Sequence, residues 1–167
     1  SSDVCSSDLC KTFSAKADGF AQGEGANAVI LKRLSDAEKD CDNIMAVIEG
    51  AAINHDGRSL TITTPSSIAQ QKMLRAAMQD ANVTSEDIQY IETHGTGTSL
   101  GDYIEVSSLS NVFSRNNRAT PLYLGSVKTN IGHLGATAGL ASLTKVVLSI
   151  KNNAIPANLH FDVPNPR

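Results

Sequence analysis

The sequence contains no tryptophan and few aromatic residues of any kind, which make up 4% of its 167 residues. It also lacks a hydrophobic run near the roughly 18–20 residues that cross a bilayer, so we expect no membrane interaction. Because no dense basic patch is present, nothing favours nucleic-acid binding. The three cysteines are too few for a disulfide framework, and no Cys or His pair has zinc spacing, so we expect no metal.

The rest of the composition is typical of a globular domain. Hydrophobic residues account for 41% and charged residues for 19%, with a formal net charge of −3. This balance excludes disordered and collagen-like chains. The length suits one domain with a hydrophobic core and is short for two domains.

Residues 1–9 read Ser-Ser-Asp-Val-Cys-Ser-Ser-Asp-Leu, without helical or strand periodicity and without the features of a signal peptide. They can be back-translated as AGT TCA GAC GTG TGC TCT TCC GAT CTN, the end of a common sequencing adapter. We interpret them as translated adapter, with the gene-encoded sequence starting at Cys10; the alternative is a disordered polar terminus. Without Asp3 and Asp8, 15 acidic residues against 14 basic ones leave a net charge of −1. We expect residues 10–167 to be an internal fragment of a larger domain.

Hydrophobic patterning predicts four strands, at 28–34, 45–53, 88–93 and 122–127, with polar connections at 36–42, 54–64 and 116–121. It also predicts three helices: one after Pro65, one over 101–113 and one over 136–151. Ser67 and Gln70 match a capping box at the start of the first helix. This order of strands and helices favours an α/β layer fold in which helices cover a mixed sheet.

The predicted helices differ in their apolar faces. The faces of the first two helices are formed by Leu74, Ala77, Met78 and Ala81, and by Val106, Leu109, Val112 and Phe113, respectively. The third helix is apolar on most of its faces, so we expect it to be buried.

Two of the four histidines directly follow predicted strands. His94 comes after the strand at 88–93, and His133 comes soon after the strand at 122–127. Because functional groups gather at the carboxyl ends of strands in open α/β sheets, we expect these histidines to converge on one site. The alternative is that each is an ordinary hydrogen-bonded histidine, which is how we interpret His55 and His160.

Two glycine-rich segments do not indicate a nucleotide site. Gly23-Glu24-Gly25 precedes a predicted strand, where a dinucleotide fingerprint requires a helix. We interpret this segment as a turn that glycine permits. The segment at 95–98, Gly-Thr-Gly-Thr, lacks the lysine of a phosphate-binding loop.

Two longer motifs carry a family resemblance. The first is His-Gly-Thr-Gly-Thr at 94–98, followed by Gly101, Asp102 and Glu105. The second is Gly-Ser-Val-Lys-Thr-Asn-Ile-Gly-His at 125–133. They resemble the two histidine motifs of the β-ketoacyl synthases, and most closely those of ketosynthase domains in modular polyketide synthases. Residues 10–25 resemble the segment after the family's nucleophile, so the resemblance covers 10–167.

The resemblance implies a partial thiolase-like layered αβαβα fold, from a cytoplasmic enzyme that acts as a homodimer. It also implies decarboxylative Claisen condensation of an acyl thioester with a malonyl-type thioester, in polyketide or fatty-acid biosynthesis. The substrates of this family are carried on the phosphopantetheine of an acyl carrier protein, and no cofactor is bound directly.

Five residues match functional positions of the family. His94 and His133 match the histidines that donate hydrogen bonds to an enolate, and such donors contribute about 3–4 kcal/mol each. Lys128 matches the lysine that supports the second histidine electrostatically. Thr96 and Thr98 match hydroxyl groups that contact the phosphopantetheine arm.

The chain also departs from the family pattern. Cys10 and Cys41 do not match the nucleophilic cysteine, which lies upstream in the family, and the C-terminal glycine-rich motif is missing. Tyr103 stands where proline is usual, while Asp102 and Glu105 suit a structural role at a helix start. We therefore expect the chain alone to be inactive and to fold poorly, because apolar faces would be left uncovered.

Three alternatives remain at this point: a discrete fatty-acid elongating ketosynthase, a decarboxylase with glutamine in place of the nucleophile, and a non-catalytic partner subunit. The presence of both His94 and His133 argues against the partner subunit. The sequence does not specify the acyl chain or the extender unit, because the pocket residues that select them lie mostly outside it.

Overall fold

The structure, a computed structural model, describes residues 7–57, 64–113 and 118–166. A parallel pair of strands, β1 (Tyr90–Glu92) and β2 (Tyr123–Gly125), lies at its centre. The helices are α1 (Leu34–Lys39), α2 (Ser67–Asp80), α3 (Ser99–Phe113), α4 (Lys128–Ile131) and α5 (Ala138–Asn152), with a 3₁₀ turn, η2 (Gly135–Thr137), before α5. Residues 1–6 of the interpreted adapter, 58–63 of the predicted loop and 116–117 of the predicted turn lie outside the described ranges.

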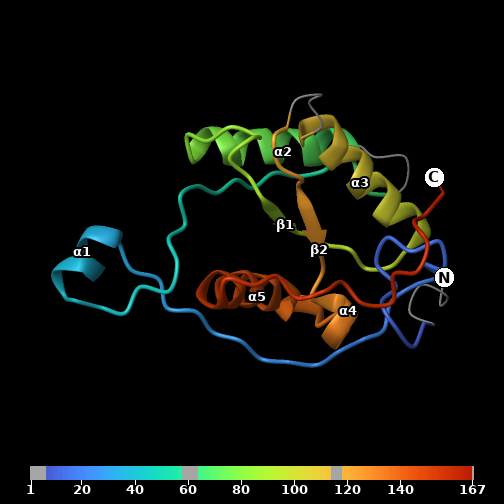
Figure 1. Ribbon diagram of the computed structural model, residues 1–167, viewed down its shortest axis with the longest axis horizontal. Helices are drawn as coiled ribbons and strands as arrows, with labels where there is room; N and C mark the ends of the chain where they lie inside the picture. The colour runs from blue at the N-terminus through green and yellow to red at the C-terminus, as the bar shows by residue number, and fades with distance from the viewer. Residues whose placement is uncertain (1–6, 58–63, 114–117, 167) are drawn as a thin grey trace.

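The two strands separate two helical layers (Figure 1). Helices α2 and α3 pack against each other on one side, and α4 and α5 lie on the other. The hydrophobic core lies between the first pair and the strands, and consists of Leu109, Val112 and Phe113 with Leu74, Met78, Ile88, Ile91, Leu122 and Leu124 packed against them. The predicted inward face of α3 is wrong at Val106, which is 37% exposed. Val106 lines a surface cavity of about 720 Å³ together with Phe161.

Helix α2 uses a different capping residue from the one predicted. The Ser66 side chain, rather than that of Ser67, accepts a hydrogen bond from the Ala69 N–H at 3.3 Å. Ser67 is the first helical residue, and its hydroxyl oxygen lies 2.8 Å from Ser108 Oγ of α3. The N-cap is therefore Ser66, one residue before the predicted Ser67, and its side chain bonds the N–H three positions ahead, as is usual for an N-cap.

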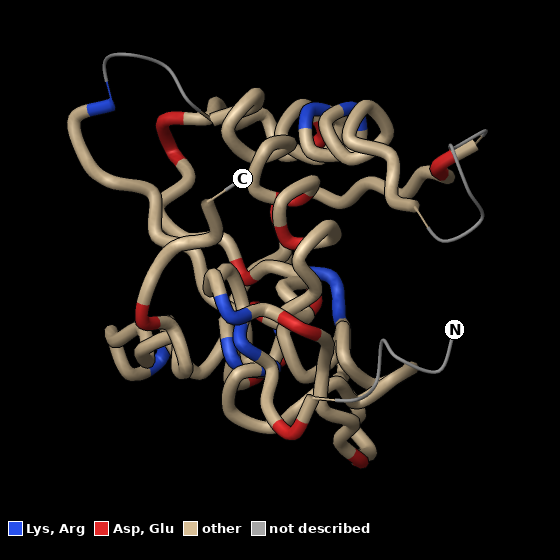
Figure 2. Tube along the Cα trace, turned by 90° about the vertical axis from the view of Figure 1, so that its right-hand side faces the viewer, with Lys and Arg blue, Asp and Glu red and all other residues tan. Residues whose placement is uncertain are grey.

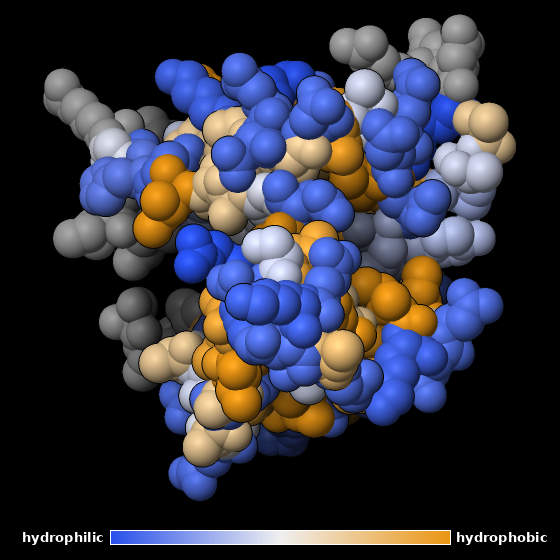
Figure 3. Space-filling view, turned by 90° about the vertical axis from the view of Figure 1, so that its left-hand side faces the viewer, coloured by the Kyte–Doolittle hydropathy of each residue, from blue (hydrophilic) through white to orange (hydrophobic). Residues whose placement is uncertain are grey.

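The strands predicted at 28–34 and 45–53 are not formed. Both segments run extended on either side of α1, but neither has a partner strand within the described residues. Their apolar side chains stand in solvent, and Ile30 and Ile53 are 99% and 96% exposed. Figure 3 shows the molecule from the side of α1, where apolar side chains gather on the surface. The prediction failed because hydrophobic patterning identifies segments that are suited to a β-strand. It does not show whether another segment is available to pair with them.

Helix α5 is less buried than predicted. Its buried residues are Ala138, Ala141 and Lys145, whereas Leu148 and Ile150 are 48% and 60% exposed. One face of α5 lies against β1, and the described part of the chain covers the other apolar residues of the helix only partly. The predicted mixed sheet is likewise wrong for the described residues, in which the two strands are parallel.

Charged residues of both signs are interspersed along the trace (Figure 2). Across residues 7–57, 64–113 and 118–166, no three His, Cys, Asp or Glu side chains are grouped to hold a metal ion. None of the described helices is long and apolar enough to cross a membrane.

Candidate active site

The structure brings His94 and His133 together. His94 follows β1 by two residues, and His133 follows the short helix α4 that comes after β2. The two imidazole rings meet edge to face, with centroids 5.4 Å apart. The Phe20 ring lies against His133, with centroids 5.1 Å apart. The predicted convergence of the two histidines at the carboxyl ends of the strands is therefore confirmed.

A carboxylate on α3 holds the backbone of the His94 loop. Glu105 accepts the His94 N–H at 2.7 Å and the Gly95 N–H at 2.8 Å, one on each oxygen. Gly95 has φ +41°, and a Cβ there would lie 2.5 Å from Thr12 Cγ2. Only glycine fits this turn, because the position is both left-handed and crowded. The loop that presents His94 is thus fixed by backbone contacts.

A second carboxylate, Asp102, fixes the next part of the same loop. It is 1% exposed, and it accepts the Gly97 N–H at 3.1 Å and the Phe13 N–H at 2.7 Å. Burial raises the pKa of both Asp102 and Glu105, and these backbone hydrogen bonds oppose the shift. The predicted structural role of the two acids fits this geometry, but they act through loop backbone rather than through the helix dipole.

The glycine-rich segment at 19–25 forms one wall beside His133. The His133 N–H donates to Ala21 O at 2.8 Å, and His133 O accepts the Gly23 N–H at 3.0 Å. The sequence predicted only a turn here, and its contact with His133 was missed because more than a hundred residues separate the segments. The pairing of 21–23 with His133 fixes the backbone from which the imidazole projects.

A local hydrogen bond sets the tautomer of His133. Its Nδ1 atom accepts the Gly135 N–H at 3.0 Å. A ring nitrogen that accepts carries no proton, so a neutral His133 has its proton on Nε2. His133 can therefore donate one hydrogen bond from Nε2 without changing its charge.

Lys128 is a buried cation whose charge acts on both histidines. It is the first residue of α4 and is 2% exposed. Burial lowers the pKa of Lys128, while Glu105 and Glu92 oppose that shift. Partial burial and the charge of Lys128 lower the pKa of His133. Burial, the charge of Lys128 and the neighbouring His133 together lower the pKa of His94 to about 4. Both imidazoles are therefore neutral hydrogen-bond donors near neutral pH.

The two threonines of the first motif lie on the loop that follows His94. Thr96 is 7% exposed, and its hydroxyl oxygen is 3.3 Å from that of Thr98. Their hydroxyl groups are thus placed by the same loop that Glu105 and Asp102 hold.

Neither described cysteine has the setting of a nucleophile. Cys10 is 2% exposed, burial raises the pKa of its thiol, and its sulfur lies 3.7 Å from Ala21 O. Cys41 follows α1, at the end of the molecule away from α4 (Figure 1). A reactive cysteine needs an exposed thiol with a lowered pKa, so within the described residues the candidate site is limited to histidine, lysine and threonine side chains.

Two family models together match most of the chain. Residues 1–37 match the family model described as "Beta-ketoacyl synthase, N-terminal domain", and residues 45–162 match "Beta-ketoacyl synthase, C-terminal domain". The chain is 52% identical over 157 residues to one phenolphthiocerol/phthiocerol polyketide synthase polypeptide of Mycobacterium tuberculosis. It is 49% identical over 158 residues to another polypeptide of the same synthase in that species. These matches cover 94% of the chain but only 7% and 8% of the two relatives.

Solved structures of ketosynthases superpose closely on the chain. The ketosynthase from module 6 of the bacillaene synthase of Bacillus subtilis 168 gives a TM-score of 0.90 at 43% identity, covering 95% of this chain and 28% of that one. The oxazolomycin ketosynthase domain OzmH KS7 of Streptomyces albus JA3453 gives 0.90 at 38% identity, covering 98% and 29%. The predicted thiolase-like fold is confirmed for the part of the domain that this chain spans. The chain belongs to the β-ketoacyl synthase family.

Proposed function

We propose that residues 10–167 form the histidine-bearing part of a ketosynthase domain that condenses acyl units in polyketide biosynthesis. The observation that carries this proposal is the edge-to-face pair of His94 and His133, with ring centroids 5.4 Å apart. Identity of about half to polyketide synthase polypeptides supports polyketide assembly over a discrete fatty-acid enzyme. The presence of two neutral imidazoles supports a catalytic domain over a non-catalytic partner subunit.

In the proposed reaction a malonyl-type thioester loses carbon dioxide. The bond to the carboxylate carbon breaks, and its electron pair moves into the thioester, which becomes an enolate with negative charge on oxygen. His133 donates to this oxygen from Nε2, because its Nδ1 accepts the Gly135 N–H, and His94 donates from the facing ring. Preorganised donors of this kind contribute about 3–4 kcal/mol each to transition-state stabilisation.

Carbon–carbon bond formation completes the condensation. The enolate carbon attacks the carbonyl carbon of an acyl thioester, the bond to sulfur breaks, and the thiolate leaves. The product is a β-ketoacyl thioester. In the family a cysteine holds the acyl group, and no position of this chain matches it, so this step belongs to the complete domain.

The remaining site residues serve binding and electrostatics in this proposal. Burial and, after it, the charge of Lys128 lower the pKa of both imidazoles, and the charge of Lys128 favours an anionic intermediate nearby. Thr96 and Thr98 contact the phosphopantetheine arm by which an acyl carrier protein delivers the substrate. The complete domain acts as a homodimer, and no directly bound cofactor takes part.

A chimeric ketosynthase tests the proposal. Residues 10–167 replace the matching segment of the Bacillus subtilis bacillaene module 6 ketosynthase, which supplies the rest of the domain; we call this protein the chimeric domain. Release of carbon dioxide from malonyl-pantetheine is measured for it and for its H94A and H133A variants. We expect the chimeric domain to decarboxylate the substrate and each variant to lose about 10²–10³ in rate. A folded chimeric domain without this activity, or histidine variants that are fully active, would contradict the proposal.

A further inference from the structure

A buried ion pair joins β1 to α5 close to the site. Lys145 Nζ lies 2.8 Å from Glu92 Oε2, and the two side chains are 8% and 4% exposed. Every other ion pair among the described residues has at least one partner that is 47% or more exposed. A buried ion pair is weak evidence for a stabilising role, because desolvation offsets the attraction. Its geometry therefore calls for another explanation.

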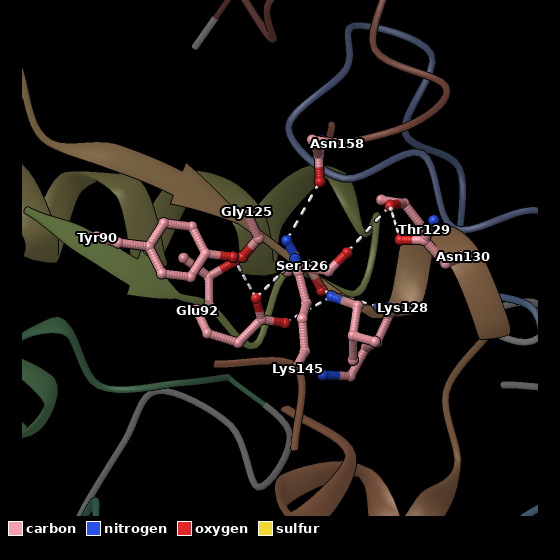
Figure 4. A network of polar contacts seen from close by, with 12 residues as sticks. Tyr90, Glu92, Gly125, Ser126, Lys128, Thr129, Asn130, Lys145 and Asn158 are labelled. Atoms are coloured by element: carbon pink, nitrogen blue, oxygen red, sulfur yellow. Dashed lines mark hydrogen bonds and ion pairs between the residues drawn. The ribbon is translucent and has the colours of Figure 1, made fainter. Parts of the chain in front are cut away.

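Both oxygens of the Glu92 carboxylate have partners. Oε2 accepts the Tyr90 hydroxyl as well as Lys145 (Figure 4), and Lys145 Nζ lies 5.6 Å from the centre of the Tyr90 ring. Oε1 accepts the backbone N–H of Val127. Tyr90 and Lys145 thus orient the carboxylate through Oε2, while Oε1 bonds the backbone of Val127, the residue directly before Lys128.

The end of β2 is shaped to leave room for this cluster. Gly125 pairs with Glu92 in the sheet register. A Cβ at Gly125 would lie 2.7 Å from Tyr90 Oη and 3.3 Å from Lys145 Nζ. Glycine at the end of β2 therefore leaves room for the Tyr90 hydroxyl and the Lys145 ammonium that hold the carboxylate.

The charge of Lys128 is favoured by carboxylates that do not contact its ammonium directly. Within the described residues no carboxylate oxygen lies within 4 Å of Lys128 Nζ. Burial lowers its pKa, and Glu105 and Glu92 are the two largest opposing influences. Glu105 also holds the backbone of His94, and Glu92 holds the backbone that leads into Lys128.

We propose that Glu92, aimed by Lys145 and Tyr90, is a positioning residue that fixes the Val127–Lys128 turn and so places the Lys128 ammonium for enolate formation. This inference rests on the proposed function, because it assigns a role within the same site. Glu92 touches no reacting atom and acts through Lys128. Its contribution belongs to the decarboxylation step rather than to binding of the substrate.

Kinetics of variants in the chimeric domain test this role. E92A removes the carboxylate, whereas E92Q keeps an oxygen that can accept the Val127 N–H but removes the charge. We expect E92A to lower kcat for carbon dioxide release by about 10- to 100-fold with little change in KM, since small misplacement near the chemistry costs this much. E92Q should recover part of that loss. K16M, which breaks the exposed Lys16–Asp162 pair, is the control and should leave both constants unchanged.

The outcomes separate this inference from the proposed function. A folded E92A variant with kcat within twofold of the parent, measured well below its melting temperature, would assign Glu92 a purely structural role and overturn the inference. If E92A does not fold, E92D carries the test, because its shorter side chain keeps the charge but withdraws the carboxylate from the Val127 N–H. A lower kcat at unchanged KM in E92D supports positioning, and an unchanged kcat overturns it. Absence of decarboxylation in the parent chimeric domain would instead count against the proposed function.

Discussion

The Glu105 carboxylate binds the backbone of His94, with Oε1 2.7 Å from the His94 amide nitrogen and Oε2 2.8 Å from that of Gly95. A helix that packs in the core therefore sets the place of the His94 side chain through the main chain. The contact also explains why the loop needs an acid at this point of α3, since a carboxylate offers two acceptors and no donor.

The first prediction concerns this contact. E105Q in the chimeric domain turns an amide donor towards one of the two N–H groups, which leaves a buried donor without an acceptor. We expect the free energy of unfolding to fall by about 1–3 kcal/mol. We also expect decarboxylation to slow, because the backbone of His94 is no longer held in place by the Glu105 carboxylate. Urea unfolding and carbon dioxide release measure the two effects. E86Q, on an exposed glutamate, is the control, and equal stability of the two variants would refute the expectation.

The crowded turn at Gly95 leads to the second prediction. G95A places a methyl group 2.5 Å from Thr12 Cγ2 in a left-handed conformation, so it adds overpacking to backbone strain. We expect a loss of about 2–4 kcal/mol in unfolding free energy. G135A, at φ +59° with no atom within 4 Å of its Cβ, should cost only about 1 kcal/mol. Equal losses for the two variants in urea unfolding would show that packing contributes nothing at Gly95.

The third prediction follows from the lowered pKa of His94. Its value of about 4 in the folded state lies below the ordinary value of 6.5, so the unfolded chain takes up the proton first. The contribution of His94 to the free energy of unfolding is fully present above pH 6.5, and it is lost as the pH falls through the window down to about 4. We expect the urea midpoint of the chimeric domain to drop more between about pH 7.5 and 4.5 than that of H94N. An equal drop in both proteins would rule out this linkage.

Local sequence patterns predicted the parts of the structure that depend on local interactions. Helices α2, α3 and α5 follow from apolar periodicity, and the meeting of His94 with His133 follows from their places after neighbouring strands. The segments at 28–34 and 45–53 were predicted wrongly, because a strand exists only where another chain segment supplies its hydrogen bonds.

The groups that hold the site could not be predicted for a different reason. Glu105 with His94, Glu92 with Val127, and Gly23 with His133 are contacts between a side chain or turn and a distant backbone atom. Backbone N–H and C=O groups are the same in every residue, so no sequence pattern marks which of them a carboxylate will bind. A family resemblance supplies residue types at such positions but not their partners.

The fourth prediction concerns the end of α1. Cys41 has φ +56°, its N–H donates to Glu38 O at 3.1 Å, and the next N–H, of Asp42, donates to Ala37 O at 2.9 Å. This is a Schellman motif, in which glycine is the usual residue at the left-handed position. We expect C41G to raise the unfolding free energy of the chimeric domain by about 0.5–1 kcal/mol. C41S retains a Cβ and should change stability little, so an equal effect of the two variants would point to loss of the thiol instead.

The final prediction concerns the chain on its own. Ile30 and Ile53 are 99% and 96% exposed, and Leu31 and Ile48 are 71% and 57% exposed. Extended apolar segments with unpaired backbone groups pair readily with other chains. We therefore expect the isolated polypeptide to self-associate, as measured by size-exclusion chromatography with light scattering. The double variant I30K/I53K should reduce the associated fraction without changing helix content, because neither side chain packs in the core. A monomeric parent that melts cooperatively would show that these segments find cover within the chain itself.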